Sequence, residues 1–486
     1  MGAVAGVFSK SQIDAPSLVV KMLSAMKHRA QDGVAVAWAD TLESADSPGD
    51  LRASSQEQGT AIGYGFTKIL PNDKTQPIRA GNAWLSLDGR LVTDGRLVGG
   101  EKAAKILETM LSPTELPSIE RNIDGAYALC CCTDDTLLVT RDPMGLKPIY
   151  IGRLGDLIAV ASDRKALWAV GIAETATFPP GGCLRASTIE SVVEPPKNRH
   201  DATRSLPRTK ASEDELLQLL TESVSIQTSD LRTVAVGFSG GLDSAVITKI
   251  AKDAGVDLLL VTVGIGRTAE MSFAESTART FQLPVVTREL SKKDAAECLD
   301  HILWLIEEPS LMKVSIAMAI RWIAQEASRN GRTVVMLGQG SDELFGGYKK
   351  FATILGEQGT VAASEAISHS IRDTYEVNYQ RDEQVVSGLR AELRLPFATS
   401  KIAEFAYTVP LSMKVRASSD NIRKWILRDA AIKLGIPSEI ALRPKKAVQH
   451  ASGVEKAIRE IAKDHSLSPS TYLAQRLQTM RNEFTS

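Results

Sequence analysis

Hydrophobic residues in the first 195 positions form short runs separated by Gly, Asp and Pro turns. Apolar runs of this length bounded by turn residues are typical of strands, whereas apolar residues three and four positions apart indicate helices. The pattern predicts strands at residues 3–8, 34–38, 83–87, 126–132, 136–140 and 157–161, and helices at 16–27 and 101–110. Together these elements predict a layered α+β domain.

From residue 233 the pattern changes to strands that alternate with helices. An apolar strand at 233–238 precedes a Gly-containing turn and a helix with apolar residues at Val246, Ile247, Ile250, Ala251 and Ala254. Further strands are expected at 258–263, 285–286 and 333–337, with a helix at 269–281, and the rest of the chain is expected to be mainly helical. The alternation predicts a doubly wound α/β parallel sheet, which binds its ligands beyond the carboxyl ends of the strands.

Residues 196–212 interrupt both patterns. They are rich in Pro, Arg, Lys, Ser and Thr and have no sustained apolar period, which is typical of a linker. We therefore expect an N-terminal domain at 1–195, the linker at 196–212 and a C-terminal domain at 213–486. A chain of 486 residues has room for two or three domains at about 150 residues each.

The charges of the chain nearly cancel, since 57 Lys and Arg against 58 Asp and Glu give a net charge of −1. Such a chain has no overall basic field for nucleic acid, and no apolar stretch approaches the roughly 20 residues of a bilayer span. The five cysteines contain no CxxC pair, which argues against a zinc ribbon or a disulfide framework. We expect a cytoplasmic protein with no nucleic-acid or membrane partner. Cys130, Cys131 and Cys132 are interpreted as structural thiols of a strand.

The strand at 233–238 leads into the hexapeptide Ser239, Gly240, Gly241, Leu242, Asp243 and Ser244. Its two glycines let the backbone approach a phosphate, the following helix N-terminus offers unpaired N–H groups, and the serine hydroxyls can donate. Asp243 is a candidate ligand for a Mg²⁺ ion that bridges phosphate oxygens. A Gly-rich turn before a capped helix is the plainer alternative, but the whole hexapeptide between a strand and a helix favours nucleotide binding.

A second loop, at residues 338–348, follows the strand at 333–337 and is expected on the same edge of the sheet. Its Asp342 is a candidate second carboxylate for Mg²⁺, because nucleotide-bound Mg²⁺ usually takes one or two carboxylates besides phosphate oxygens and water. The alternative is an acidic residue that begins a helix, which is compatible with the metal role.

The hexapeptide resembles the pyrophosphate-binding loop of the N-type ATP pyrophosphatases. The wider chain resembles glutamine-dependent asparagine synthetase and its relative, β-lactam synthetase, through motifs at residues 28–33, 141–150, 338–348, 392–397 and 443–446. The resemblance implies an N-terminal domain of the N-terminal-nucleophile glutaminase fold. It implies a C-terminal ATP pyrophosphatase domain that uses ATP and Mg²⁺ to adenylate a carboxylate, which an amine then attacks.

By this resemblance, Ser239, Gly240, Gly241, Asp243 and Ser244 hold pyrophosphate and metal. Gly338 and Gly340 are implied in the same nucleotide site, and Val263 is implied to meet the adenosine.

The resemblance also implies that Lys445 supplies a catalytic cation near the α- and β-phosphates, with Lys446 as the competing residue. Glu392 matches a glutamate that supports the catalytic lysine in β-lactam synthetase. The alternatives are a solvated basic turn for the lysines and a surface carboxylate for Glu392. Apolar neighbours of Glu392 make its partial burial expected, and a buried carboxylate needs a partner.

The synthetase site departs from the family pattern at one residue and in one segment. Gln339 stands where asparagine synthetases have Glu and where β-lactam synthetase has a catalytic tyrosine. Gln339 can hydrogen bond but cannot act as a base or hold an ammonium by charge. The segment 307–315 lacks the Asp and Arg spacing of members that use aspartate, so the acceptor acid stays open.

The N-terminal domain departs more sharply. The family's glutaminase nucleophile is a cysteine directly after the removed initiator methionine, and that position is Gly2 here. Glycine has no nucleophile to form an acyl-enzyme. The Asn-Gly-Glu triplet implied to clamp glutamine reads Asp88, Gly89 and Arg90, which reverses a charge. We expect that glutamine is not hydrolysed.

The sequence thus favours an ATP-dependent, asparagine-synthetase-like ligase that joins ammonia or another amine to a small-molecule carboxylate. The alternatives are a β-lactam-synthetase-like cyclase or specialised amino-acid ligase and, from another class, a non-catalytic nucleotide-binding relative. A homodimer is a further expectation.

Overall fold

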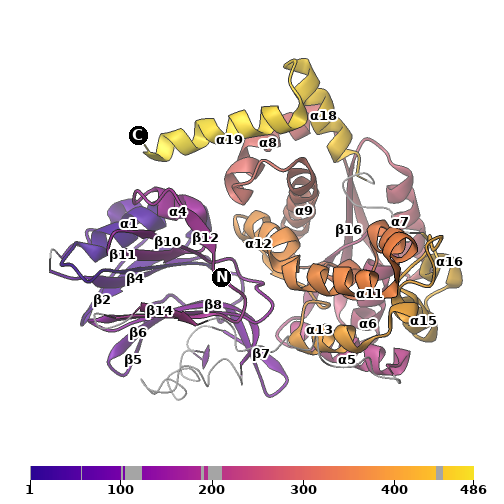
Figure 1. Cartoon of the computed structure of the whole chain (residues 1–486), viewed down its shortest axis with the longest axis horizontal. Coiled ribbons are helices and arrows are strands. Elements are labelled where there is room, and N and C mark those ends of the chain that lie inside the picture. The colour runs from indigo at the N-terminus through magenta and orange to yellow at the C-terminus, as the bar shows by residue number, and fades with distance from the viewer. Residues whose placement is uncertain are drawn as a thin grey trace. The chain divides into compact units, whose positions relative to one another are not determined.

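The structure is a computed structural model that describes residues 2–55, 57–99, 102–103, 123–187, 191–194, 211–444 and 452–485 (Figure 1). The expected helix at 101–110 and the linker at 196–212 lie largely outside the described residues, and Lys445 and Lys446 lie outside them entirely. The chain divides into two compact units, unit 1 with residues 1–197 and 475–486, and unit 2 with residues 198–474.

This division differs from the expected one at the C-terminal end. Residues 475–486 were expected in the second domain but belong to unit 1. One interaction that accounts for this is a cation–π contact, in which the Arg481 guanidinium lies 4.6 Å from the centre of the Trp168 ring.

Unit 1 is an α+β structure built on two antiparallel sheets. The first has the strand order β12-β10-β11-β1-β4-β2-β3, and the second has the order β14-β13-β9-β8-β6-β5, with β7 paired to β6. The strands are β1 (Gly2–Phe8), β2 (Gly33–Trp38), β3 (Thr41–Ala45), β4 (Thr60–Phe66), β5 (Ile78–Ala80), β6 (Ala83–Thr93), β7 (Arg96–Val98), β8 (Asp124–Cys132), β9 (Thr136–Arg141), β10 (Tyr150–Leu154), β11 (Leu157–Ala161), β12 (Thr175–Thr177), β13 (Cys183–Ser187) and β14 (Ser191–Glu194). The helices are α1 (Ala15–Ala25), α4 (Arg164–Trp168) and the 3-10 turns Lys27–Arg29 and Pro48–Asp50.

Strand β1 is buried on both faces, which explains why it is apolar throughout rather than alternating. Ala3, Ala5 and Val7 pack in the cluster under α1, whereas Val4 and Phe8 pack in the cluster between the two sheets. Figure 1 shows α1 and α4 over one face of the first sheet and the second sheet against its other face. The layered fold predicted from the sequence is confirmed.

The expected strands are present, but several are longer and others were missed. Strand β6 runs to Thr93 instead of residue 87. Strand β4, of sequence TAIGYGF, was not predicted because its two glycines weaken the apolar pattern. Cys130, Cys131 and Cys132 lie buried in β8, and burial raises the pKa of Cys131 to about 12, so these thiols are unreactive.

A buried charge cluster centred on Asp163 ties the 3-10 turn Lys27–Arg29 of unit 1 to the start of α4. Asp163 is fully buried, and its carboxylate lies 2.9 Å from Arg29 Nη2, 3.1 Å from Lys165 Nζ and 3.2 Å from His28 Nε2. Burial alone would raise the pKa of the Asp163 carboxyl, but the Arg29 and Lys165 charges hold it well below its usual range. Burial also lowers the pKa of His28 to about 3, so the imidazole is neutral.

Unit 2 is built on a parallel sheet with the strand order β17-β16-β15-β18-β19. Its strands are β15 (Thr233–Gly237), β16 (Asp257–Ile265), β17 (Val285–Leu290), β18 (Val334–Met336) and β19 (Glu392–Arg394). Its helices are α5 (Glu213–Thr228), α6 (Leu242–Asp253), α7 (Ala269–Thr280), α8 (Lys292–Ile306), α9 (Leu311–Arg329), α10 (Ser341–Phe345), α11 (Lys349–Thr374), the π-helix Tyr375–Tyr379, α12 (Gln380–Ser387), α13 (Ser400–Thr408), α14 (Leu411–Lys414), α15 (Trp425–Lys433), α16 (Ser438–Ala441) and α18 (Val454–Asp464). The last helix, α19 (Pro469–Thr485), begins in unit 2.

The order of the strands decides where loops converge. Helices α6 and α9 pack against β15 and β16, and α7 packs against β16 and β17. The chain order of the neighbours reverses at β15, which lies between β16 and β18. Ligands of doubly wound sheets bind beyond the strand ends at such a reversal, so the loops after β15 and β18 frame the expected position.

The Asp163 cluster generates a stability prediction for unit 1. Asp163→Asn leaves the Arg29 and Lys165 charges buried without their carboxylate, so we expect the free energy of unfolding of unit 1 to fall by about 3–5 kcal/mol. Urea denaturation monitored by hydrogen exchange of the β1 amides measures this change. Asp40→Asn is the control, because the Asp40 side chain is 93% exposed beside Arg79 and its pair is worth about 0–1 kcal/mol. Equal effects of the two variants would contradict the prediction.

Candidate active site

The loop between β15 and α6 is shaped to receive an anion. Gly240 has φ +70°, and a Cβ there would lie 2.9 Å from Ala274 Cα, so the loop requires glycine at this position. The Ser239 hydroxyl accepts from the Gly241 N–H at 3.2 Å and lies 3.3 Å from the Ser244 hydroxyl. Gly241 precedes α6 and offers no side chain to cap it. The first N–H groups of α6 therefore face the loop with the positive end of the helix dipole, as a phosphate requires.

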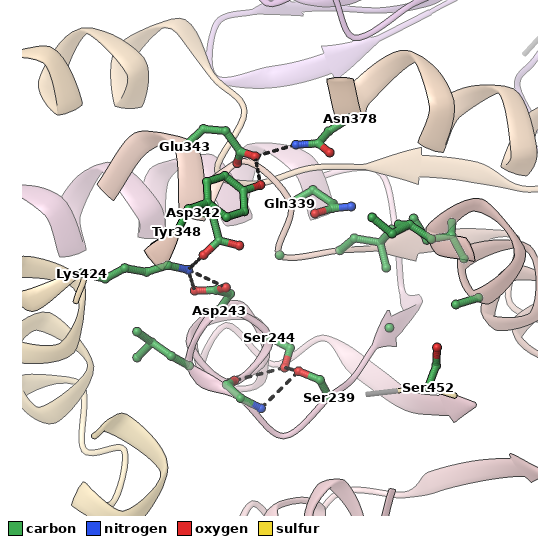
Figure 2. Close-up of a pocket in the computed structure, with 18 of the residues that line it drawn as sticks. Ser239, Asp243, Ser244, Gln339, Asp342, Glu343, Tyr348, Asn378, Lys424 and Ser452 are labelled. Atoms are coloured by element: carbon green, nitrogen blue, oxygen red, sulfur yellow. Dashed lines mark hydrogen bonds and ion pairs between the residues drawn. The ribbon is translucent and has the colours of Figure 1, made fainter. Parts of the chain in front are cut away.

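The two candidate metal ligands converge on one lysine. Lys424 Nζ lies 2.7 and 2.8 Å from the Asp243 carboxylate oxygens and 2.6 Å from Asp342 Oδ1, and it donates to Ser341 Oγ at 3.1 Å. Figure 2 shows this ammonium between the two aspartates, which come from the start of α6 and from α10. The two carboxylates therefore point toward a single position that a cation occupies.

Lys424 reaches this position through an unusual backbone conformation. It has φ +56° and Arg423 has φ +52°, directly before α15, in the left-handed region that costs a non-glycine residue free energy. The Arg423 guanidinium donates to the Gly347 carbonyl at 3.0 Å, which helps to hold the turn. Lys424 is 2% exposed, and burial lowers its pKa, while the Asp243 charge opposes that shift.

A cavity of about 850 Å³ opens beside this cluster, entirely within unit 2. Its lining at the strand ends includes Ser239, Gly241, Asp243, Ser244, Val261, Thr262, Val263, Met271, Gly338, Asp342, Lys424, Arg428 and Arg443. The Arg443 guanidinium also lies 3.5 Å from the centre of the Phe273 ring. This end of the cavity combines apolar strand residues with serines, open helix N–H groups and cations, which is the chemistry that a nucleotide needs.

Comparison with known proteins identifies the family of the chain. The family model of asparagine synthase matches residues 215–381 and 356–479, which together exceed half of the chain. The chain belongs to the asparagine synthase family. A second family model, of a glutamine amidotransferase domain, matches residues 69–169 in unit 1.

Relatives span the chain to different extents. A Methanocaldococcus jannaschii protein named as a "putative" glutamine-hydrolysing asparagine synthetase is 26% identical over 96% of this chain and 96% of its own length. Glutamine-hydrolysing asparagine synthetase 2 of Oryza sativa subsp. japonica is 24% identical over 71% of this chain and 60% of its own. The solved glutamine phosphoribosylpyrophosphate amidotransferase of B. subtilis is 17% identical, covers 69% of this chain and 81% of that chain, and has a TM-score of 0.36, which supports no argument about this chain.

The structure brings together most of the residues that the sequence singled out as site residues of this ligase family. Those that line the cavity are Ser239, Gly241, Asp243, Ser244, Val263, Gly338, Gln339 and Asp342. Gly240 and Gly340 are not among the described residues that line the cavity, but both lie in the loops that frame it and have a positive φ. A Cβ at Gly340, whose φ is +92°, would lie 2.4 Å from the Tyr379 hydroxyl.

Glu392 is buried beside a partner whose identity the sequence did not predict. It is 4% exposed in β19, and its Oε1 lies 2.8 Å from Arg394, which also pairs with Asp230 at 2.6 Å. The expected burial with a partner is therefore present, with Arg394 as a partner, and Glu392 is not among the described residues that line the cavity. Its support of Lys445 stays a prediction, because Lys445 lies outside the described residues.

Sequence reasoning missed several polar residues of the cavity, namely Lys424, Glu343, Tyr348 and Asn378. Lys424 lies in a segment with the charged composition of an ordinary solvent-exposed turn. No local signal in the sequence therefore distinguishes it from a surface lysine. Glu343 directly follows Asp342 in the loop that was already singled out, and this adjacency was the one available signal.

The residues present fit a Mg²⁺ ion held together with nucleotide phosphates. Asp243 and Asp342 supply hard oxygen donors that already converge on one cation, the Lys424 ammonium. No group of three or more His, Cys, Asp and Glu side chains suited to a metal occurs among the residues that the structure describes. A pair of carboxylates suits Mg²⁺ that takes its remaining oxygens from phosphates and water.

The aspartate pair generates a prediction about pyrophosphate release. Asp243→Asn or Asp342→Asn removes charge from the phosphate and metal site, so we expect pyrophosphate release from MgATP to fall by at least about 100-fold. Each variant keeps one carboxylate for Lys424, and thermal unfolding checks that the fold persists. Asp253→Asn at the other end of α6, where Asp253 pairs with Lys249, is the control. Undiminished release by both active-site variants would refute the assignment.

Proposed function

We propose that this protein is an ATP-dependent ligase that adenylates a small carboxylic acid and transfers ammonia or another amine to it without using glutamine. The observation that carries the proposal is the convergence of Asp243, Asp342 and Lys424 beside the open N-terminus of α6 in a large cavity. Membership of the asparagine synthase family supports the general reaction. The absence of glutamine use is argued from unit 1 alone.

In the first step, a carboxylate oxygen of the acceptor attacks the α-phosphorus of ATP, the bond to the β-phosphate oxygen breaks, and pyrophosphate leaves. Negative charge grows on the departing pyrophosphate. The N–H groups at the start of α6, the Ser239 and Ser244 hydroxyls and the Lys424 ammonium stand where they stabilise that charge. Asp243 and Asp342 would hold Mg²⁺, which supplies further charge neutralisation when bound.

In the second step, a neutral amine attacks the acyl carbon, the bond from that carbon to the AMP oxygen breaks, AMP leaves, and the nitrogen gives a proton to water. Gln339 Nε2 donates to Asp382 Oδ2 at 2.8 Å, which orients the amide. Gln339 lines the cavity, so its other amide atom, Oε1, is available to accept an N–H of the incoming amine. Burial raises the pKa of Asp382, while the adjacent Arg381 charge lowers it, and Arg381 lies 2.6 Å from Asp382. Asp382 is thus a positioning residue for Gln339.

Unit 1 supports the absence of glutamine use first through the space around Gly2. A Cβ at Gly2 would lie 2.0 Å from the Gly65 carbonyl oxygen and 2.7 Å from Tyr64 Cζ. The Gly2 N–H donates to Asp88 Oδ1 at 2.9 Å, which fixes the backbone in this position. A side chain at position 2 therefore requires the β1–β4 pairing to shift, which a strand buried on both faces resists.

The second support is a buried ion pair. Arg90 lies where the family has a glutamate implied to hold the ammonium group of glutamine, and its Nη2 is 3.1 Å from Asp73 Oδ1. Both side chains are less than one-tenth exposed. A guanidinium that is already paired with Asp73 offers no negative charge to the ammonium group of glutamine, unlike the glutamate of the family.

We further propose a cytoplasmic location. The buried, unpaired thiols of β8 suit a reducing compartment. Within the described residues, no helix is both long and apolar enough to cross a membrane.

The position of Gln339 generates a prediction about how much amide is formed for each pyrophosphate released. Gln339→Leu removes the acceptor for the amine but leaves the phosphate site intact. We expect pyrophosphate release to change by less than about threefold while the amide formed per pyrophosphate falls by at least about 10-fold. The two products are measured in parallel with MgATP, ammonia and the acid that gives the fastest pyrophosphate release. Gln358→Leu on the exposed face of α11 is the control, and an unchanged product ratio in Gln339→Leu would contradict the role.

A second prediction concerns the nitrogen source. We expect ammonia but not glutamine to support amide formation, and activity to rise with pH as ammonium, of pKa about 9, loses its proton. Gly2→Cys is expected to lower stability without producing glutamate from glutamine. Gly49→Cys is the control, because the nearest atom to a Cβ there is the Ser47 hydroxyl oxygen at 3.8 Å. Glutamine-dependent turnover by the unmodified protein, free of ammonia, would refute this part of the proposal.

A further inference from the structure

The cavity extends beyond its nucleotide end along α9 and α11, and this part has one apolar side. We call Met312, Ile316, Ile354, Ala366 and Val377 the apolar wall, since all five line the cavity. Met312 is 42% exposed and Val377 is 37% exposed, although both are hydrophobic. Apolar side chains left open in a cavity favour a ligand with an apolar body, because its binding removes their surface from water.

The opposite side carries one buried carboxylate. Glu343 is 3% exposed and lines the cavity. Both donors that reach it, Asn378 Nδ2 at 2.6 Å and the Tyr348 hydroxyl, bond to Oε1 (Figure 2). No described residue donates to Oε2. A carboxylate buried to this extent needs a partner, and here the cavity is the space from which one can come.

Protein cations near Glu343 are already engaged elsewhere. Arg381 pairs with Asp382, and Lys424 pairs with the two aspartates of the phosphate site. Lys313, which neighbours Met312 of the apolar wall, pairs with Glu308 at 2.5 Å. None of the described residues forms an ion pair with Glu343, so a cationic group of a ligand is the complementary partner.

We propose that the acceptor acid is an amino acid whose ammonium group pairs with Glu343 and whose apolar side chain lies on the apolar wall. The proposal rests on the ligase function proposed above. Glu343 and Asp342 both line this one cavity. An ammonium paired with Glu343 therefore shares the cavity with the phosphate site, as the amino and carboxylate groups of one amino acid require.

Aspartate fits this part of the cavity less well. Its additional carboxylate would meet the apolar wall and the acidic residues Glu343 and Asp373, although His369 and Ser370 also line the cavity. The lysine that lines this end in the described part of the chain, Lys350, is exposed, and its ammonium lies 5.4 and 5.1 Å from the ring centres of Tyr348 and Phe351. An acidic side chain thus meets repulsion or loses hydration, whereas an apolar one does not.

The test is pyrophosphate release by the full chain with MgATP and four acids, L-leucine, L-phenylalanine, L-aspartate and 4-methylpentanoate. The last is leucine without its amino group. We expect kcat/KM for leucine or phenylalanine to exceed that for aspartate by at least about 10-fold. We expect 4-methylpentanoate to be weaker than leucine by about 10- to 100-fold, the range for a hydrogen-bonded charge.

Two variants separate the binding roles from structural ones. Glu343→Gln keeps an oxygen for Tyr348 and Asn378 but removes the charge, so KM is expected to rise about 10-fold or more for leucine and not for 4-methylpentanoate. Glu365→Gln, on the exposed face of α11, is its control. Ile316→Thr in the apolar wall is expected to raise KM for leucine roughly 10-fold. Ile432→Thr is its control, since Ile432 is 42% exposed on α15 and does not line the cavity.

Three results would overturn the proposed acceptor. The first is a higher kcat/KM for aspartate than for leucine and phenylalanine. The second is an equal rise in KM for leucine and 4-methylpentanoate in Glu343→Gln. The third is the lack of pyrophosphate release with all four acids by protein that still binds MgATP. Calorimetric titration with MgATP, in the absence of any acid, measures nucleotide binding alone. It therefore distinguishes a wrong acceptor from a failure of the ligase function. Loss of MgATP binding itself would contradict the ligase proposal instead.

Discussion

The buried ammonium of Lys424 is the interaction on which the active site of unit 2 depends. It joins Asp243 and Asp342, which lie in different loops, to a segment 181 residues after Asp243. Removing this charge from water is unfavourable, and the two carboxylates offset that cost only in this geometry. The left-handed backbone at Lys424 adds to the cost. The fold therefore holds two carboxylates and one ammonium together where the proposed phosphate and metal would bind.

The same arrangement suits the two successive steps of the proposed reaction within one cavity. At the strand ends, cations and helix N–H groups line the part of the cavity where the proposed pyrophosphate would leave. Further along, Gln339 is held by Asp382, and Glu343 is held by Asn378 with one oxygen left for a ligand. Each polar group is thus oriented by a neighbour before substrate arrives, which lowers the reorganisation needed during reaction. Under the proposed acceptor, the apolar wall would add specificity without adding charge.

Unit 1 keeps a packed core although position 2 is a glycine without a side chain. Its core depends on β1, which packs against α1 on one face and against the second sheet on the other. Neither contact needs a side chain at Gly2. The Asp163 cluster, with Arg29 and Lys165, stabilises the helical side of the same sheet. The interactions that stabilise unit 1 are therefore independent of a nucleophile at position 2.

The sequence by itself determined the two-part architecture and the loops that carry Asp243 and Asp342, because apolar periodicity and glycine turns are local signals. It also determined that Gly2 offers no nucleophile. Only the tertiary structure showed that Lys424 lies between the two aspartates, that Glu392 pairs with Arg394, and where the apolar wall lies. The physical reason is that these contacts depend on which strands become neighbours. A charged side chain in a turn looks the same in sequence whether water or a carboxylate surrounds it.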